Sequence, residues 1–303
     1  MPRSAQEIST VFILVLTGIV STDAFAAVWY VDMENAGTED GTSWTTAFRT
    51  IQPTIDAAFL AGGGEVWVAE GVYDEPRTSI VHPAPDDVNT GSVVLKGGVE
   101  LYGGFIGIGP GGNETERTQR KWTTHVTTLE GSTARDGNPA YHVVVGAMSS
   151  TLDGFTITGG DAGGGGSSKT NILNAGGGMF NKSLFMALAN CVFDENRAFS
   201  AGGGVFNLYA SPSITECTFS ENEAYADGGG VGGVHNETAS PSFSKCLFVE
   251  NAASGQFSVG AVRSTHGSSA SFLDCSFIST LSSGNSKKLV STLFGRVYPS
   301  VSL

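Results

Sequence analysis

The chain repeats one six-residue phrase at nearly constant spacing, and this repetition limits the fold more than any other feature. The phrase Cys-x-Phe-x-Glu-Asn begins at Cys191, Cys217 and Cys246, and a degraded copy begins at Cys275. The four cysteines are 26, 29 and 29 residues apart. Repeats of this length are typical of solenoids, in which each repeat forms one turn of a coil. We therefore expect an all-β solenoid.

A second phrase, Gly-Gly-Gly-x-Phe-Asn, precedes the first in each repeat. Its copies begin at Gly176 and Gly202, and the glycine run predicts that a third copy begins at Gly228. Glycine is abundant in the chain, with 42 of 303 residues, but it lacks the three-residue period of collagen. This composition suits a coil that turns often.

An earlier segment extends the frame of the repeats toward the N-terminus. Residues 152–162 align with residues 214–224, with Phe155 at the cysteine position and Gly160 at the asparagine position. Glycine is a natural replacement for asparagine where φ is positive. We expect roughly eight or nine coils in all, each one repeat long.

Equal positions of successive repeats are predicted to stack in columns. Apolar residues alternate with variable ones in Cys-x-Phe, which is the period of a β-strand. Parallel strands lie about 4.8 Å apart, so each residue lies over its equivalent in the next coil. The predicted columns contain Cys191, Cys217, Cys246 and Cys275; Phe193, Phe219, Phe248 and Phe277; and Asn196, Asn222 and Asn251.

The four cysteines are interpreted mainly as packed thiols. All occupy one strand position, where side chains of neighbouring parallel strands point the same way and fit the dihedral angle of a disulfide poorly. One or two disulfides remain an alternative, as does a metal site, although the Cys-x-x-Cys spacing of zinc sites is absent from the sequence.

Residues 1–26 have the pattern of a secretory signal peptide. Arg3 supplies a positive charge, residues 11–20 form an apolar run too short to span a bilayer, and residues 24–26 read Ala-Phe-Ala. This pattern predicts a secreted or cell-surface protein with no membrane span in the mature chain.

The segment after the signal peptide is predicted to cap one end of the solenoid. Residues 28–31 form a β-branched and aromatic strand, and residues 51–61 form a helix that Thr50 caps and a glycine run at 62–64 ends. The predicted buried face of this helix contains Ile51, Ile55, Ala58 and Phe59. An amphipathic helix is suited to cover the apolar end of a solenoid.

The predicted domain boundaries follow from these features. They are a signal peptide at 1–26, an N-terminal strand and capping helix at 27–64, a β-helix at 65–280, and a C-terminal tail of unclear structure at 281–303.

Short phrases near the N-terminus resemble a known family. They lie at residues 30–32, 40–44, 48–52, 57–58 and 65–73, and together resemble the opening of right-handed parallel β-helix proteins with the pectate-lyase fold. The glycine and Phe-x-x-Asn phrases are similar to repeats of chlamydial polymorphic outer-membrane proteins, which are surface β-helices implicated in adhesion. The resemblance implies a right-handed parallel β-helix. It implies less about activity, since the matching residues belong to turns and ladders.

The charge of the chain limits its partners. It has 16 Lys and Arg against 29 Asp and Glu, a formal net charge of −13. A charge of this sign disfavours nucleic acid and anionic membranes, and it repels a polyuronate unless metal ions intervene. Calcium is the candidate cofactor, because carboxylates stack in one predicted column. That column contains Glu195, Glu221 and Glu250; the alternative is that these side chains fan into water.

A second charged column is the candidate catalytic set. The residues before the ladder cysteines face outward, and Glu216, Lys245 and Asp274 are predicted to stack on successive coils. Lyases of the resembled fold use a Lys or Arg base on the outer strand face together with calcium. The other interpretation is a column of opposite charges on a solvated sheet, which contributes tenths of a kcal/mol per pair.

Three aromatic residues form the candidate glycan-binding set. Tyr102, Phe105 and Trp122 lie in or beside a loop at residues 107–124. Loops often carry the function of a solenoid, and aromatic rings can provide a platform for sugars. The alternative is ordinary loop packing.

These features favour an exported, non-catalytic β-helix protein for adhesion, glycan contact or cell-envelope structure. Its expected partner is a polysaccharide or another cell-surface protein. The alternative is a polysaccharide lyase or glycoside hydrolase acting on acidic polysaccharide. A convergent acid and base set would distinguish the two, and the sequence contains no recognisable one.

Overall fold

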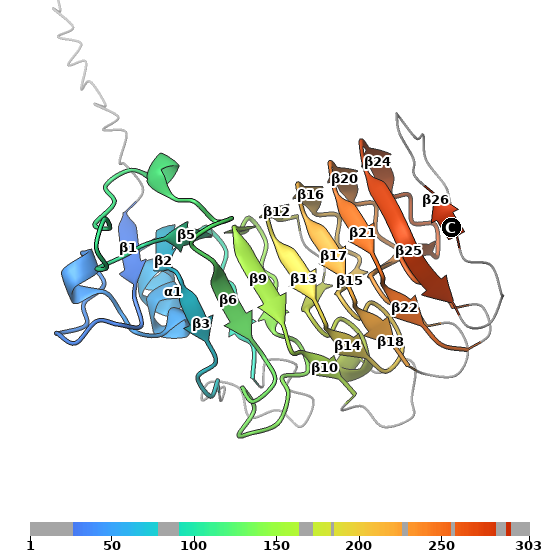
Figure 1. The fold of residues 1–303 in the computed structure, drawn as a ribbon, viewed down its shortest axis with the longest axis horizontal. Coiled ribbons are helices and arrows are strands. Elements are labelled where there is room, and N and C mark those ends of the chain that lie inside the picture. The colour runs from blue at the N-terminus through green and yellow to red at the C-terminus, as the bar shows by residue number, and fades with distance from the viewer. Residues whose placement is uncertain are drawn as a thin grey trace, which may run out of the picture.

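The computed structural model describes residues 27–77, 91–163, 172–182, 185–225, 230–255, 258–282 and 289–291. These segments form an elongated stack of β-strand coils, with the N-terminal coil at one end and the C-terminal coil at the other (Figure 1). The predicted signal peptide lies outside the described residues, as does most of the predicted C-terminal tail.

The first sheet contains one strand from each of eight coils, which agrees with the predicted number. Every neighbouring pair in it is parallel. In spatial order its strands are β1 (Val28–Val31), β2 (Gly64–Ala69), β5 (Val99–Phe105), β8 (Thr151–Asp153), β12 (Ala187–Ala189), β16 (Ser213–Thr215), β20 (Ser242–Ser244) and β24 (Ser271–Leu273).

The second sheet follows the first along each coil and is joined through β25 to a row of short strands. Its longer row contains β3 (Gly71–Tyr73), β6 (Thr127–Glu130), β9 (Phe155–Thr158), β13 (Val192–Asp194), β17 (Thr218–Ser220), β21 (Leu247–Val249) and β25 (Ser276–Ser282). The short row contains β22 (Ala252–Ala253), β18 (Glu223–Ala224), β14 (Arg197–Ala198) and β10 (Asp161–Ala162).

The third sheet closes six of the coils. Its strands are β4 (Val93–Val94), β7 (Val144–Val145), β11 (Met179–Lys182), β15 (Val205–Leu208), β19 (Val234–Glu237) and β23 (Val262–Thr265), all paired in parallel. The described segments also contain three short 3-10 helices: η1 (Trp44–Thr46), between β1 and the α-helix that follows it, and η2 (Arg117–Gln119) and η3 (Ile172–Asn174), between strands. The chain is therefore a parallel β-helix solenoid, as predicted.

The predicted cysteine and phenylalanine columns are confirmed. All four cysteines are buried with free thiols. The rings of Phe193 and Phe219 stack with centroids 5.2 Å apart, and those of Phe219 and Phe248 are 4.8 Å apart. Phe248 and Phe277 repeat the 4.8 Å spacing with an interplanar angle of 5°. One column of phenylalanine rings therefore runs through the core of the four coils that contain cysteine.

The predicted asparagine ladder is also confirmed. Asn196 donates from Nδ2 to Oδ1 of Asn222 at 3.1 Å, and Asn222 donates in the same way to Asn251 at 2.9 Å. All three side chains are fully buried. The ladder ends at the main-chain N–H of Gly160, which donates to Oδ1 of Asn196.

At this bend, the residue with the left-handed backbone conformation (positive φ) is the one that precedes the asparagine. Glu195 and Glu221 both have φ of 51°, and Glu250 has φ of 55°. The glycine that matches them in the earlier coil is Gly159, with φ of 76°. The expectation that Gly160 replaces asparagine because of positive φ is therefore wrong, although its place in the ladder is correct.

A second asparagine ladder lies in the third sheet, and the sequence prediction missed it. Asn181 donates to Asn207 and Asn207 to Asn236, each from Nδ2 to Oδ1 at 2.9 Å. Val205 pairs with Val234, so the third copy of the glycine phrase spans residues 231–236. The predicted start at Gly228 is wrong by three residues.

Helix α1 (Ile51–Leu60) covers the N-terminal end of the coils, as predicted (Figure 1). Ile51, Ile55 and Ala58 are fully buried in the main core, but Phe59 is 48% exposed, so its predicted burial is wrong. Thr50 occupies the N-cap position with extended backbone, yet its hydroxyl makes no capping hydrogen bond. Among the described segments, none of the helices has the length and apolar character needed to cross a bilayer.

The last coil extends slightly beyond the predicted end at residue 280. Strand β25 continues to Ser282, and β26 (Leu289–Ser291) returns antiparallel to it. Phe277 pairs with Ser291 and Thr280 with Leu289. One strand edge of the final coil is therefore partly paired.

Candidate functional site

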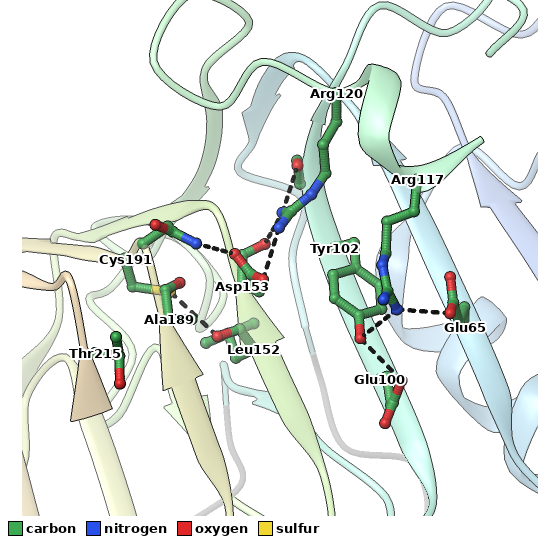
Figure 2. Close-up of polar contacts among 12 residues, drawn as sticks. Glu65, Glu100, Tyr102, Arg117, Arg120, Leu152, Asp153, Ala189, Cys191 and Thr215 are labelled. Atoms are coloured by element: carbon green, nitrogen blue, oxygen red, sulfur yellow. Dashed lines mark hydrogen bonds and ion pairs between the residues drawn. The ribbon is translucent and has the colours of Figure 1, made fainter. Parts of the chain in front are cut away.

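The candidate functional site is a group of polar residues on the outer face of the first sheet, under the loop that carries η2 (Figure 2). We call it the arginine site. Its members are Glu65, Glu100, Tyr102, Arg117, Arg120, Trp122, Asp153 and Asn190.

Strand register brings the sheet residues of this site together. Glu65 on β2 lies opposite Glu100 on β5, and Tyr102 on β5 lies opposite Asp153 on β8. The residues that alternate with them, including Leu101 and Leu152, are fully buried. Because side chains alternate across a strand, the polar residues point away from the core.

The loop can lie flat on the sheet because a glycine is beneath it. A Cβ atom on Gly104 would fall 2.6 Å from the Cα atom of Trp122, and Gly104 has φ of 95°. Both the space and the conformation therefore require glycine at this position. Within the loop, the Oε1 atom of Gln119 accepts hydrogen bonds from the main-chain N–H groups of Thr115 and Glu116, each at 2.8 Å, which fixes η2.

Arg117 reaches from η2 to two strands. Its Nη1 atom donates to Oε1 of Glu65 at 2.7 Å and to the hydroxyl of Tyr102 at 2.8 Å. Its guanidinium lies 4.5 Å from the centre of the Tyr102 ring. The Arg117 side chain is nevertheless 45% exposed. A cation at the surface is thus held in one orientation.

Tyr102 connects Arg117 to Glu100. The Tyr102 hydroxyl accepts from Arg117 and donates to Oε2 of Glu100 at 2.9 Å. Burial, followed by the hydrogen bond and the charge of Glu100, raises the pKa of Tyr102. The phenol therefore stays protonated at neutral pH and remains a donor.

Arg120 forms the second half of the site with Asp153. Its Nη2 atom lies 2.6 Å from Oδ2 of Asp153, and its Nη1 atom donates to the main-chain oxygens of Gly103 and Asp153. Asn190 donates to the other carboxylate oxygen of Asp153 at 2.8 Å. The guanidinium also lies 4.7 Å from the centre of the Trp122 ring. The pair is nearly buried, so its charges interact more strongly than those of an exposed pair.

The predicted aromatic platform is wrong in two of its three residues. Phe105 is fully buried and stacks on Trp67 with ring centroids 4.8 Å apart. Tyr102 is only 6% exposed, and both arginines lie against its ring. Trp122 is half-buried and keeps a place beside the candidate site.

The predicted catalytic column is at the surface of a turn. Glu216, Lys245 and Asp274 all have φ of 53°, and Lys245 lies 2.9 Å from Glu216 in an exposed ion pair. The hydrogen bond and charge of Glu216 raise the pKa of Lys245, whereas a general base at neutral pH needs a lowered one. This geometry favours the interpretation as a solvated charge column, and catalysis by these residues stays an untested prediction.

The predicted calcium column also faces solvent. Glu195, Glu221 and Glu250 are exposed. In the described part of the chain, no three His, Cys, Asp or Glu side chains converge as a metal site requires. The calcium prediction therefore rests on the sequence pattern alone.

Comparison with known proteins gives a loose similarity of fold. No family model matches the chain. No curated protein matches it. Among solved structures, the chain is similar to a pectin methylesterase from Aspergillus niger, with 14% identity, a TM-score of 0.36, and coverage of 89% of this chain and 91% of that one. It is also similar to Escherichia coli ybhc, with 11% identity, a TM-score of 0.34, and coverage of 84% and 76%.

Proposed function

We propose that this protein is an exported β-helix that binds a polysaccharide at the arginine site. The observation that carries the proposal is the exposed guanidinium of Arg117, fixed by Glu65 and Tyr102 on two rigid strands. Binding sites typically place a few oriented polar groups beside aromatic residues. The aromatic residue beside this site is the half-buried Trp122, with Arg120 against its ring.

The charges of the site favour a neutral polysaccharide over a polyuronate. Two arginines are balanced against three carboxylates, Glu65, Glu100 and Asp153, and the chain as a whole carries −13. A ligand rich in hydroxyl groups can accept from Arg117 and donate to Glu100. A polyuronate meets net repulsion unless cations screen it. Adhesion to a cell surface, which the repeat resemblance suggests, is compatible with this binding.

The test is calorimetric titration of the mature protein with a neutral glucan, a galactan and polygalacturonate, the last with and without calcium. Arg117→Ala is expected to weaken binding about tenfold, the loss of roughly 1.4 kcal/mol. The matched control is Arg197→Ala, which removes an exposed, ion-paired arginine on β14. Binding of no member of this set, or equal affinity in both variants, would contradict the proposal.

Hydrolysis is a second candidate function, and one observation favours it. Glu65 and Glu100 lie opposite each other on neighbouring strands and both point outward. Retaining glycosidases place two carboxyl groups about 5–5.5 Å apart. The check is release of reducing sugar or of unsaturated uronate from the same polysaccharides. Turnover that Glu100→Gln abolishes would establish catalysis at this site, and turnover lost in Lys245→Ala would assign it to the exposed column instead.

A further inference from the structure

A column of aromatic rings lies on the outer side of the third sheet, separate from the phenylalanine column of the core. The ring of His142 lies 5.1 Å from that of Phe180, centroid to centroid, and Phe180 lies 6.0 Å from Phe206. Phe206 in turn lies 5.3 Å from His235. Strand register continues the column to Arg263, which is opposite His235. A histidine thus occupies each end of a phenylalanine pair.

A thin layer of chain covers this column. Phe180 and Phe206 form an apolar cluster with Ala175 and Ala201, against which Ile172 and Leu208 pack. The cluster is distinct from the main core, which contains the inward-facing residues of the same strands. His142 is fully buried and His235 is 9% exposed. We call the residues that pack against the two phenylalanine rings from outside the column, Ile172, Ala175 and Ala201, the cover.

Each histidine has one ring nitrogen with a partner and one without. Nδ1 of His142 lies 2.8 Å from the main-chain oxygen of Gly176, and its Nε2 atom is buried with no hydrogen-bond partner among the described residues. Nε2 of His235 lies 3.1 Å from the hydroxyl of Thr265, and its Nδ1 atom is likewise buried with no hydrogen-bond partner among the described residues. A neutral imidazole tolerates this arrangement as a bare acceptor. A protonated one becomes a buried cation with an unsatisfied N–H group.

Within the described residues, no carboxylate is among the groups that act on either imidazole. The charged groups that act on His235 are Arg263 and His266, both of which disfavour a further proton, while Glu237 lies 3.7 Å from His266. For His142 the influences are burial and the Gly176 carbonyl, with no charged group. Burial is the largest cause in both, and it lowers the pKa of His142 to about 4 and that of His235 to about 3.

We propose that the two buried histidines make the cover acid-labile, so that protonation opens it and exposes the aromatic column while the phenylalanine core stays stacked. The sign follows from linkage. Both groups bind protons more weakly in the folded state than in the unfolded state, where the pKa is near 6.5. Stability is therefore complete above about pH 6.5 and is lost as the pH falls toward the folded-state values. The core column contains only phenylalanines, which do not titrate.

The test is hydrogen exchange with mass spectrometry and binding of an apolar dye, on the mature chain between pH 7 and pH 3.5. In the wild type we expect residues 172–182 and 199–208 to lose protection at a higher pH than residues 217–222 and 246–251, together with a rise in dye binding. Loss of protection at one common pH would overturn the proposal.

Variants separate this mechanism from general acid unfolding. His235→Phe introduces the residue that the preceding coil already has at this position, Phe206, so it is expected to fold. His235→Phe alone should lower the pH midpoint of cover opening by at least about 0.5 pH unit. Adding His142→Gln should lower this midpoint further. His125→Gln removes a surface histidine paired with Glu70 and should leave the midpoint unchanged. An unchanged midpoint in His235→Phe, or an equal shift in His125→Gln, would overturn the proposal.

Discussion

The side-chain amide of Asn222 donates a hydrogen bond to Oδ1 of Asn251, 29 residues further along the chain, at 2.9 Å. The same Nδ2 atom donates to the main-chain oxygen of Phe193 in the preceding coil, at 2.8 Å. Asn222 also accepts from the main-chain and side-chain N–H groups of Asn196. One side chain therefore satisfies buried polar groups in both neighbouring coils.

Removing this amide is expected to be costly. Asn222→Ala leaves buried donors and acceptors of the neighbouring coils without partners, and each such group costs about 1–3 kcal/mol. We expect a loss of about 2–5 kcal/mol in the free energy of unfolding, measured by urea denaturation. Glu221→Gln is the control, because it changes the exposed neighbour and leaves the ladder intact. A loss below about 1 kcal/mol would show that the ladder is not buried as described.

The glutamates before the ladder are expected to be replaceable with a gain in stability. Glu221 has φ of 51°, a left-handed conformation that asparagine adopts more readily than glutamate. Glu221→Asn should therefore stabilise the chain by a few tenths of a kcal/mol to about 1 kcal/mol. The measurement is the same urea titration, and a destabilised variant would contradict the assigned conformation.

The calcium prediction has its own test. If cations bridge Glu195, Glu221 and Glu250, the melting temperature should rise with calcium and fall with chelator, and Glu221→Gln should remove the difference. The three glutamates are exposed, and the described residues contain no cluster of carboxylates that could hold a metal ion, so we expect that neither addition changes the melting temperature. A calcium-dependent rise that Glu221→Gln abolishes would establish the site.

The four thiols are expected to be inert in the folded protein. Burial raises the pKa of the Cys217 thiol, whereas the hydrogen bond with Cys246 lowers that of Cys275. All four thiols are buried, and Cys275 is only 3% exposed, so burial keeps a reagent from reaching them. A thiol reagent at pH 8 should label fewer than one thiol per native chain over minutes and four after denaturation. Fewer than four labelled thiols in denaturant without reductant would instead indicate disulfides.

The periodic parts of the fold could be predicted from the sequence because a solenoid places equal residues in equal environments. Cys191 and Phe193 are separated by one variable residue, and the same spacing recurs in each later repeat. This alternation is enough to predict that both side chains point into the core, where they are buried. The predicted alignment of the repeats was wrong at the glycine run that begins at residue 228. Three glycines there resemble the start of the glycine phrase, whereas strand register assigns that phrase to residues 231–236. There His235 replaces the phenylalanine of the earlier copies, which hid the second asparagine ladder.

The arginine site could not be predicted because it does not repeat. Arg117 and Arg120 come from a loop, and their partners Glu65 and Asp153 lie 52 and 33 residues away. The sequence shows aromatic residues beside that loop, but spacing could not show that Phe105 is buried against Trp44 and Trp67 in a second apolar cluster. Tyr102 and Asp153 are opposite each other in the strand register. The sequence could have shown that they are close only if the length of the N-terminal coils had been known.

The stacking of coils in register is tested most directly by a distance between two ladder residues. In protein labelled with ¹⁵N-asparagine, we expect a nuclear Overhauser effect between the side-chain amide protons of Asn222 and Asn251, assigned by its loss in Asn251→Ser. Detection of that contact would confirm that residues 29 positions apart lie in adjacent coils. Its absence in the folded protein, with the Asn222 amide exchanging freely with water, would contradict the account.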